Sequence, residues 1–258
     1  MADEAAVRET MEALAGLLRG SDWQSIGAVS VKQGRDIVTD ADLRLQEQII
    51  SQIRERFPDH NILAEEAEYE RTASPFTWVI DPVDGTINFS RGYPVFAVSV
   101  ALVQGETPVS GIVYVPPLQR LYSAVRGKGA FCNGRALRCG SVERLQDSLV
   151  SVILTSHFNG GESARASAII EQANMQTRGV RVMVCESAEL CFIAEGILDG
   201  NVSIKADPYG AMAGKLILEE AGGRFSQLCG APFGLYSDTI LASNGLLHES
   251  LRELCAGL

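Results

Sequence analysis

Residues 78–89, WVIDPVDGTINF, pass from an apolar segment directly into side chains that bind cations and anions. Asp81 and Asp84 follow a short apolar strand, where buried negative charge is costly unless water or a cation matches it. Gly85 and Thr86 can open a helix, and the N–H groups at a helix start bind phosphate well. Carboxylates beside such a pocket suit Mg²⁺, which prefers carboxylates together with waters and substrate phosphate. The stretch therefore predicts a site for a phosphate group and a divalent cation.

Two more acidic groups precede this stretch. RDIVTDAD places Asp36, Asp40 and Asp42 where a strand-like segment passes into a helix, and NILAEEAE places Glu65 and Glu66 after another apolar segment. Taken singly, Asp40 or Asp42 reads as a helix N-cap, and Glu66 reads as solvated surface. Three acidic strand ends in one half of the chain nevertheless favour a shared site.

Composition limits the classes of function. The chain has 258 residues, 46% of them apolar, which suits one or two domains with a large core. The net charge of −10 without a basic cluster disfavours nucleic acid as the main ligand. The six cysteines form no C-x-x-C pair and the three histidines are scattered, which argues against a zinc site. No apolar run is long enough to span a bilayer, so we expect no membrane partner and a cytoplasmic location.

The elements that must position these residues change in type along the chain. Helical periodicity covers about 3–20 and 40–57, where Leu43, Ile50 and Ile53 share one face. Strand-like TWVI is followed by FAVSVALVQG, VSGIVYVPP and RLYSAVRG, which predict an antiparallel meander.

Beyond the meander, strand-like and helical segments alternate. SLVSVILT, VRVMVC and NVSIKA read as strands, while ESARASAIIEQAN, SAELCFIAEG and AMAGKLILEEAGG read as helices. This alternation is typical of a layered α/β fold. We therefore expect an α/β protein in two parts, an α+β half over 1–143 that binds metal and phosphate and an α/β half over 144–258 that contributes the substrate pocket.

These motifs give the chain its resemblance to a known family. DIVTDAD, LAEEAE, WVIDPVDGTINFSRGYPVFAVSVAL and LILEEAGG fall in the order found in the inositol monophosphatase family, which belongs to the lithium-sensitive, Mg²⁺-dependent phosphatases. DPVDGTINF is the most specific of them, and together they cover most of the chain. The resemblance implies a layered αβαβα sandwich of the inositol monophosphatase and fructose-1,6-bisphosphatase type. It also implies a homodimer and the hydrolysis of a phosphomonoester.

The same resemblance implies a set of metal ligands. Glu65 and Asp81, with the backbone carbonyl of Val83, would hold a first Mg²⁺. Asp81 and Asp84 would hold a second ion, and Glu65 would share a third and weaker one. Mn²⁺ is the alternative cation. Paired metals would activate a water and relieve charge on the entering and departing oxygens.

Roles in phosphate binding and water activation are implied as well. Gly85 and Thr86 would present N–H groups to the phosphate beside Asp84, so these three positions contact substrate. Thr86, oriented by Asp42, would help to activate the attacking water near Glu65. The predicted catalytic set is therefore Asp42, Glu65 and Thr86.

The chain departs from the family pattern at two positions near the last motif. Gly210 stands where the family has an aspartate that binds the second metal. Asp207, followed by Pro208, lies three residues earlier and forms a favoured pair for a helix start. Asp207 would either carry the displaced carboxylate or serve only as a cap. Ser203, assigned to substrate contact, stands where inositol phosphatases have a glutamate, and Lys205 follows.

A third departure concerns the substrate pocket. Val184, Cys185, Glu186 and Ser187 replace a run of small residues before the helical SAELCFIAEG. These changes disfavour inositol phosphate as the natural substrate. They leave open a bisphosphate such as fructose 1,6-bisphosphate, a 3′-phosphoadenosine nucleotide or histidinol phosphate. Two hypotheses follow: a Mg²⁺-dependent phosphatase acting on a small phosphorylated metabolite, or a catalytically weakened relative with a binding or regulatory role.

Overall fold

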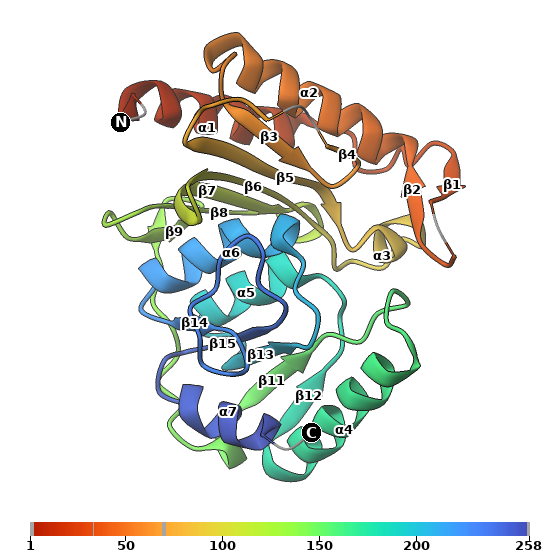
Figure 1. Ribbon diagram of the computed structural model, residues 1–258, viewed down its shortest axis with the longest axis vertical. Helices are drawn as coiled ribbons and strands as arrows, with labels where there is room; N and C mark the ends of the chain where they lie inside the picture. The colour runs from red at the N-terminus through yellow and green to blue at the C-terminus, as the bar shows by residue number, and fades with distance from the viewer. Residues whose placement is uncertain (1–2, 33, 69–70, 257–258) are drawn as a thin grey trace.

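The computed structural model describes residues 3–32, 34–68 and 71–256, and these residues form five stacked layers (Figure 1). From one end to the other, the layers are two helices, an eight-stranded sheet, two central helices, a five-stranded sheet and two further helices. The α/β class and the αβαβα sandwich predicted from the sequence are confirmed.

The helices in the described residues alternate with the sheets. The α-helices are α1 (Glu4–Gly20), α2 (Asp40–Arg56), α3 (Thr86–Ser90), α4 (Gly160–Gln176), α5 (Glu186–Ala194), α6 (Pro208–Glu220) and α7 (His248–Cys255). Two short 3₁₀ turns are η1 (Pro116–Leu118) and η2 (Leu145–Asp147). Helices α1 and α2 cover the outer face of the first sheet, α5 and α6 lie between the sheets, and α4 and α7 cover the outer face of the second sheet.

The first sheet has the spatial order β10-β9-β8-β7-β6-β5-β3-β4, and its neighbours are antiparallel except for the parallel pair β3 and β5. Its strands are β3 (Asn61–Ala64), β4 (Ala67–Glu68), β5 (Phe76–Asp84), β6 (Ala97–Gln104), β7 (Thr107–Val115), β8 (Arg120–Val125), β9 (Ala130–Cys132) and β10 (Arg135–Ala136). Strand β6 is buried on both faces, which explains why its sequence, AVSVALVQ, reads as a nearly continuous apolar run. The predicted meander is β6, β7 and β8.

The second sheet has the order β12-β11-β13-β15-β14. Its strands are β11 (Leu149–Val152), β12 (Gly179–Arg181), β13 (Gly200–Ser203), β14 (Arg224–Ser226) and β15 (Ile240–Ser243). Strands β12, β11 and β13 are mutually parallel, and β13, β15 and β14 are antiparallel. A separate hairpin joins β1 (Val29–Val31) to β2 (Ile37–Thr39) and leads into α2.

Two details of the elements differ from the predictions. Leu43 is 43% exposed, because the buried face of α2 instead runs through Asp42, Leu45 and Ile49. The strand predicted for VRVMVC is shorter than expected: β12 includes only Val180 and Arg181 of that segment, and the rest of it is a loop that leads to α5.

The two sheets occupy separate stretches of the chain but share the middle layer. The first sheet ends at Ala136 and the second begins at Leu149, on either side of the predicted boundary near residue 143. The core around α5 and α6 includes Val113 of the first sheet and Ala242 of the second. No helix among the described residues is long and apolar enough to cross a membrane.

Candidate active site

A β-bulge places the first two acidic residues. Strand β5 pairs regularly with β6 as far as Asp81 and Ser99, and the register then shifts before the next pair, Asp84 with Ala97. Bulges of this kind bend a strand and redirect its side chains, and they are common beside active sites. The predicted strand thus continues through DPVD. Asp81 is 1% exposed, and its Oδ1 has no hydrogen-bond partner within the described residues.

Gly85 makes the turn from β5 into α3. Its φ of +85° lies in the left-handed region, and a Cβ there would lie 3.2 Å from the Val95 carbonyl oxygen and 3.3 Å from that of Val184. Glycine is therefore required both by its backbone conformation and by two approaching carbonyls. Thr86 is the first residue of α3, so the turn presents both residues to the cavity described below.

Replacing Gly85 with alanine should destabilise the fold more than a left-handed glycine in open space would. We expect Gly85→Ala to lower the free energy of unfolding by at least about 2 kcal/mol, because backbone strain of about 1–2 kcal/mol is joined by the two contacts. Gly92→Ala is the matched control, since Gly92 has φ +67° and nothing within 4 Å of its Cβ position. Urea unfolding of both variants measures the difference, and equal losses would contradict it.

A cavity of about 640 Å³ connects residues from both halves of the chain. Its wall includes Gly85 and Thr86 from the first half and the segment 153–158 from the second. Six carboxylates line it, against two lysines: Asp36, Glu65, Asp81, Asp84, Glu186 and Asp207, with Lys32 and Lys205. This excess of buried negative charge is the condition under which a cation is expected to bind.

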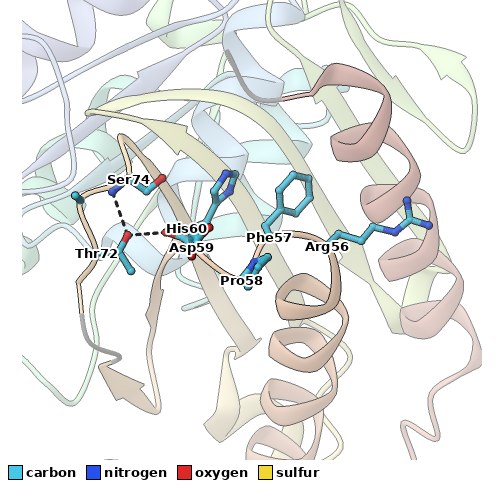
Figure 2. A pocket seen from close by; sticks show the side chains of 8 residues that line it. Arg56, Phe57, Pro58, Asp59, His60, Thr72 and Ser74 are labelled. Carbon is cyan, nitrogen blue, oxygen red and sulfur yellow. Dashed lines mark hydrogen bonds between the residues drawn. The ribbon is translucent and has the colours of Figure 1, made fainter.

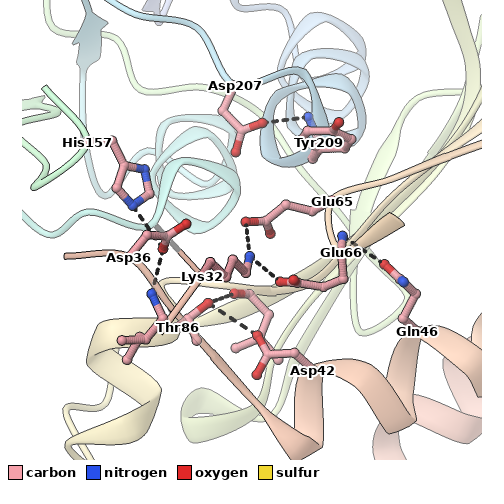
Figure 3. Close-up of polar contacts among 12 residues, drawn as sticks. Lys32, Asp36, Asp42, Gln46, Glu65, Glu66, Thr86, His157, Asp207 and Tyr209 are labelled. Carbon is pink, nitrogen blue, oxygen red and sulfur yellow. Dashed lines mark hydrogen bonds and ion pairs between the residues drawn. The ribbon is translucent and has the colours of Figure 1, made fainter. Parts of the chain in front are cut away.

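Lys32 holds the acidic pair after β3 (Figure 3). Its Nζ lies 3.1 Å from Glu65 Oε1 and 2.5 Å from Glu66 Oε1. Burial alone would lower the pKa of Lys32, but Glu65 and Glu66 outweigh it and the pKa is raised. Glu66 does not lie on the solvated surface as predicted: its side chain is 4% exposed, and burial raises its pKa to about 7.

Thr86, which lines the cavity, meets Asp42 behind it (Figure 3). The Thr86 hydroxyl lies 2.9 Å from the Val83 carbonyl and 3.2 Å from Asp42 Oδ1, so its single hydrogen has two acceptors within reach. Asp42 is fully buried and forms a reciprocal capping box with Thr39 at the start of α2. Burial raises the pKa of Asp42, while hydrogen bonds from Thr39 oppose the shift. The helix start thereby fixes the carboxylate that faces Thr86.

Asp207 caps a helix and also borders the acidic cavity. It is the N-cap of α6, where its Oδ1 accepts the Tyr209 N–H at 2.9 Å, and Pro208 is the first helical residue. The side chain also lines the acidic cavity. Burial, together with the charges of Glu65 and Asp84, raises the pKa of Asp207 to about 7. Its carboxylate therefore lies close to both of them.

Two other predicted positions lie differently. Ser203 is fully buried in β13, its hydroxyl donates to the Lys205 carbonyl at 2.8 Å, and it is not among the residues that line the cavity. The assignment of Ser203 to substrate contact is therefore not supported by the geometry. Lys205 lines the cavity with a side chain that is 52% exposed, and its Nζ lies 3.6 Å from Glu162.

Three residues near the cavity carry contacts that the sequence analysis missed. Ser187 donates from its N–H at 2.7 Å and from its hydroxyl at 2.6 Å to Asp84 Oδ2. His157 pairs with Asp36 at 3.1 Å, which joins the β1–β2 hairpin to the second half. Lys32, in the same hairpin, reaches across 33 positions in sequence to Glu65. For the contact between Lys32 and Glu65, the only hint in the sequence was a single lysine shortly before RDIVTDAD.

The acids that line the cavity are the candidate ligands for a divalent cation. In the part of the chain that is described, no three Asp, Glu, His or Cys side chains already surround one point as metal ligands do. Two of the acids instead face protein donors, Glu65 toward Lys32 and Asp84 toward Ser187. Asp81 Oδ1 and Glu186 Oε1 are buried without partners. All candidate ligands are hard oxygen donors, as Mg²⁺ prefers, so the chemistry of these residues fits a divalent cation.

Without metal, the protein should lose stability as the pH rises from 6.5 to 8. Asp207 and Glu189 both have a pKa raised by burial to about 7. The folded state therefore keeps protons that the unfolded state has released, and this stabilisation disappears as the pH passes 7. His248, whose pKa burial lowers to about 4, is neutral in both states above about pH 6.5 and does not oppose the trend.

We expect a loss of about 2 kcal/mol, or a fall in Tm on the order of 5 °C, over this pH range in EDTA. Differential scanning calorimetry in buffers of matched ionic strength measures it. A Tm that stays constant or rises toward pH 8 would contradict the burial of these acids.

A second cavity shares no lining residue with the acidic cavity (Figure 2). It has a volume of about 550 Å³ and lies where α2 ends, beside Phe57 and His60. Thr72 closes one side, because its hydroxyl donates to the Asp59 carbonyl at 2.6 Å and accepts the Ser74 N–H at 3.0 Å. None of the predicted site residues lines this cavity.

Comparisons of the sequence and the fold with known proteins point to one family. A sequence model of the Inositol monophosphatase family matches residues 2–257. The "Fructose-1,6-bisphosphatase/inositol-1-monophosphatase" of Aquifex aeolicus is 36% identical over 226 residues, which cover 88% of this chain and 84% of the relative. The protein of the same name from Thermotoga maritima is 34% identical over 233 residues, which cover 90% and 88%. The crystal structure of the extragenic suppressor protein suhB from Bartonella henselae superposes with a TM-score of 0.90 at 28% identity, covering 98% of this chain and 99% of that one.

The fold and these comparisons define a phosphatase of the layered αβαβα class. The chain belongs to the inositol monophosphatase family, so the resemblance predicted from the sequence motifs is confirmed.

Proposed function

We propose that the protein is a Mg²⁺-dependent phosphatase that hydrolyses a phosphomonoester of a small metabolite. The observation that supports this most strongly is the convergence of Glu65, Asp81, Asp84 and Asp207 on one cavity that Gly85 and Thr86 also line. Four acids from three separate segments gain nothing by sharing a buried space unless a cation joins them. Gly85 and Thr86 offer N–H groups where the phosphate of the substrate would lie.

The acids would form two main metal positions. Glu65 and Asp81, with the Val83 carbonyl, would hold a first Mg²⁺, and Asp81, Asp84 and Asp207 would hold a second, with a weaker third ion at Glu65. Bound Mg²⁺ or Mn²⁺ supplies a nucleophilic water at neutral pH and charge relief for the departing oxygen. The proposed metal set is thus Glu65, Asp81, Val83, Asp84 and Asp207.

Thr86 and Asp42 would position the attacking water. If the Val83 carbonyl oxygen were bound to the first Mg²⁺, it would no longer accept the hydroxyl hydrogen of Thr86. That hydrogen would then be free to turn to Asp42 Oδ1, 3.2 Å away. The Thr86 oxygen then accepts a hydrogen bond from water, and buried Asp42 takes the proton through the hydroxyl. Side chains in such proton relays contribute about 10²- to 10⁴-fold to a rate.

The substrate class is proposed from the relatives' names and from one departure from the family pattern. The relatives' names pair fructose-1,6-bisphosphatase with inositol-1-monophosphatase. Because the inositol-binding glutamate is replaced by Ser203, we favour sugar phosphates, bisphosphates and nucleotide 3′-phosphates over inositol phosphate. Family membership also supports a homodimer, with no nucleic-acid or membrane partner and a cytoplasmic location.

A screen for phosphate release tests the proposal. Inositol 1-phosphate, fructose 1,6-bisphosphate, a 3′-phosphoadenosine nucleotide and histidinol phosphate are assayed with Mg²⁺, with Mn²⁺ and with EDTA. We expect release from at least one of them with either metal and none in EDTA. If calorimetry detects no metal binding at millimolar concentrations and no substrate is hydrolysed, the alternative of a binding or regulatory protein replaces it. That alternative is motivated by Gly210, which removes one carboxylate.

A further inference from the structure

Gly210 of helix α6 lies directly against Asp81 and Asp84, the two acids of β5. A Cβ placed on Gly210 would lie 3.3 Å from Asp84 Oδ2 and 3.6 Å from Asp81 Oδ2. Position 210 therefore faces both carboxylates directly but offers them no side chain. Asp207 enters the cavity one helical turn earlier, so the carboxylate that the family places here is missing from its usual position.

Glu186 lies on the other helix of the middle layer and lines the same cavity. It is the first residue of α5, which packs against α6, and it is 6% exposed. Its Oε1 has no hydrogen-bond partner within the described residues. An unpaired oxygen on a buried carboxylate costs several kcal/mol unless the group is neutral or meets a cation.

Glu189, one turn along α5, is a buried carboxylate whose hydrogen bonds can be compared with those of Glu186. It is fully buried, but its Oε1 accepts the Cys185 N–H at 3.3 Å and its Oε2 accepts Asn201 Nδ2 at 2.9 Å. Both of its oxygens are satisfied by protein, and it does not line the cavity. Glu186 is thus the acid of this helix that is buried, incompletely bonded and directed to the site.

The residues around Glu186 place it near Asp84. Ser187, the next residue, donates to Asp84 Oδ2 from both its N–H and its hydroxyl, so α5 begins against that carboxylate. Burial raises the pKa of Glu186, and the charges of Asp207 and Asp84 raise it further. Glu186 therefore shares its surroundings with Asp207 and with Asp84, which faces position 210.

We propose that Glu186 is a metal ligand that, with Asp84 and Asp207, completes the divalent-cation position left open by Gly210. The inference deepens the proposed function and depends on it. A carboxylate from α5 then takes the place of one from α6. The otherwise unfavourable burial of Glu186 then has a cause.

Isothermal titration of Mn²⁺ into the full-length protein tests the proposal. Glu186→Gln should keep the fold and lower the affinity of one Mn²⁺ by at least about tenfold, as the loss of groups around metals commonly does. Glu189→Gln, the same change one turn away, should leave Mn²⁺ affinity within about twofold. The double variant Glu186→Gln with Gly210→Asp should recover most of the affinity, because the carboxylate returns from α6.

The outcomes separate this inference from the proposed function. Wild-type protein that binds no Mn²⁺ overturns both. Wild-type protein that binds, with Asp81→Asn weakening it but Glu186→Gln leaving stoichiometry and affinity unchanged, overturns only the role of Glu186. If Glu186→Gln unfolds, Glu186→Asp keeps the charge but shortens its reach. The same tenfold loss in Glu186→Asp supports the proposal, and unchanged affinity overturns it.

Discussion

Asp81→Asn should abolish Mg²⁺-dependent phosphate release while making the metal-free protein more stable. Asp81 is buried with one unpaired oxygen, and both proposed metal positions use it. Burial raises its pKa well above the ordinary range, and Glu65, Asp84 and Asp207 raise it further. Asparagine is nearly isosteric and cannot ionise, so it removes the cost of burying or protonating this carboxyl together with the metal ligand. We expect a fall in kcat of at least about 10³-fold, since metals supply several kcal/mol of transition-state stabilisation.

In EDTA the same variant should gain about 1–3 kcal/mol, because the folded state no longer has to bury a carboxylate or bind a proton to neutralise it. Mg²⁺ should then raise its Tm less than it raises that of the wild type. Asp199→Asn is the control: Asp199 is also buried and accepts the Leu149 N–H at 2.9 Å, but it lies outside the cavity. Turnover by Asp81→Asn within tenfold of wild type would rule out the mechanism.

Thr86→Val should lower kcat by about 10²- to 10³-fold with little change in stability or KM. Valine keeps the branched shape of threonine at the start of α3 but removes the hydroxyl that links the site to Asp42. The backbone N–H proposed to contact phosphate is retained, so binding of substrate should persist. Stopped-time phosphate assays over a range of substrate concentrations separate kcat from KM.

Thr86→Ser is the matched control, because serine restores a hydroxyl on the same Cβ. It should recover most of the lost rate, within about tenfold of wild type. Equal activity in Thr86→Val and wild type would show that the hydroxyl has no part in the reaction. Equal losses in Thr86→Val and Thr86→Ser would instead assign the effect to packing of the threonine methyl.

Local sequence signals predicted the parts of the site that depend on neighbouring residues. Asp81 and Asp84 were identified because DPVDGT interrupts an apolar run, and the start of α6 was identified because Asp207 precedes a proline. In both cases the deciding contacts lie within a few positions along the chain. The layered fold followed from the alternation of strand and helix patterns over longer stretches.

The parts that were missed depend on contacts between distant segments. Lys32 neutralises Glu66 from a separate hairpin, which periodicity in NILAEEAE cannot show. Leu43 was assigned to the buried face, but Asp42 takes the inward position because it caps α2 and faces Thr86. Glu186 reads as an ordinary acid at a helix start, and its burial depends on how α5 packs against the cavity.

The anomalous scattering of Mn²⁺ in a crystal grown with manganese and phosphate tests the claim that these acids gather divalent cations. We predict at least one strong peak within bonding distance of Asp81 and of either Glu65 or Asp84, with phosphate density toward Gly85. An ordered map with no peak near Asp81 and with the three carboxylates turned away from one another would contradict it.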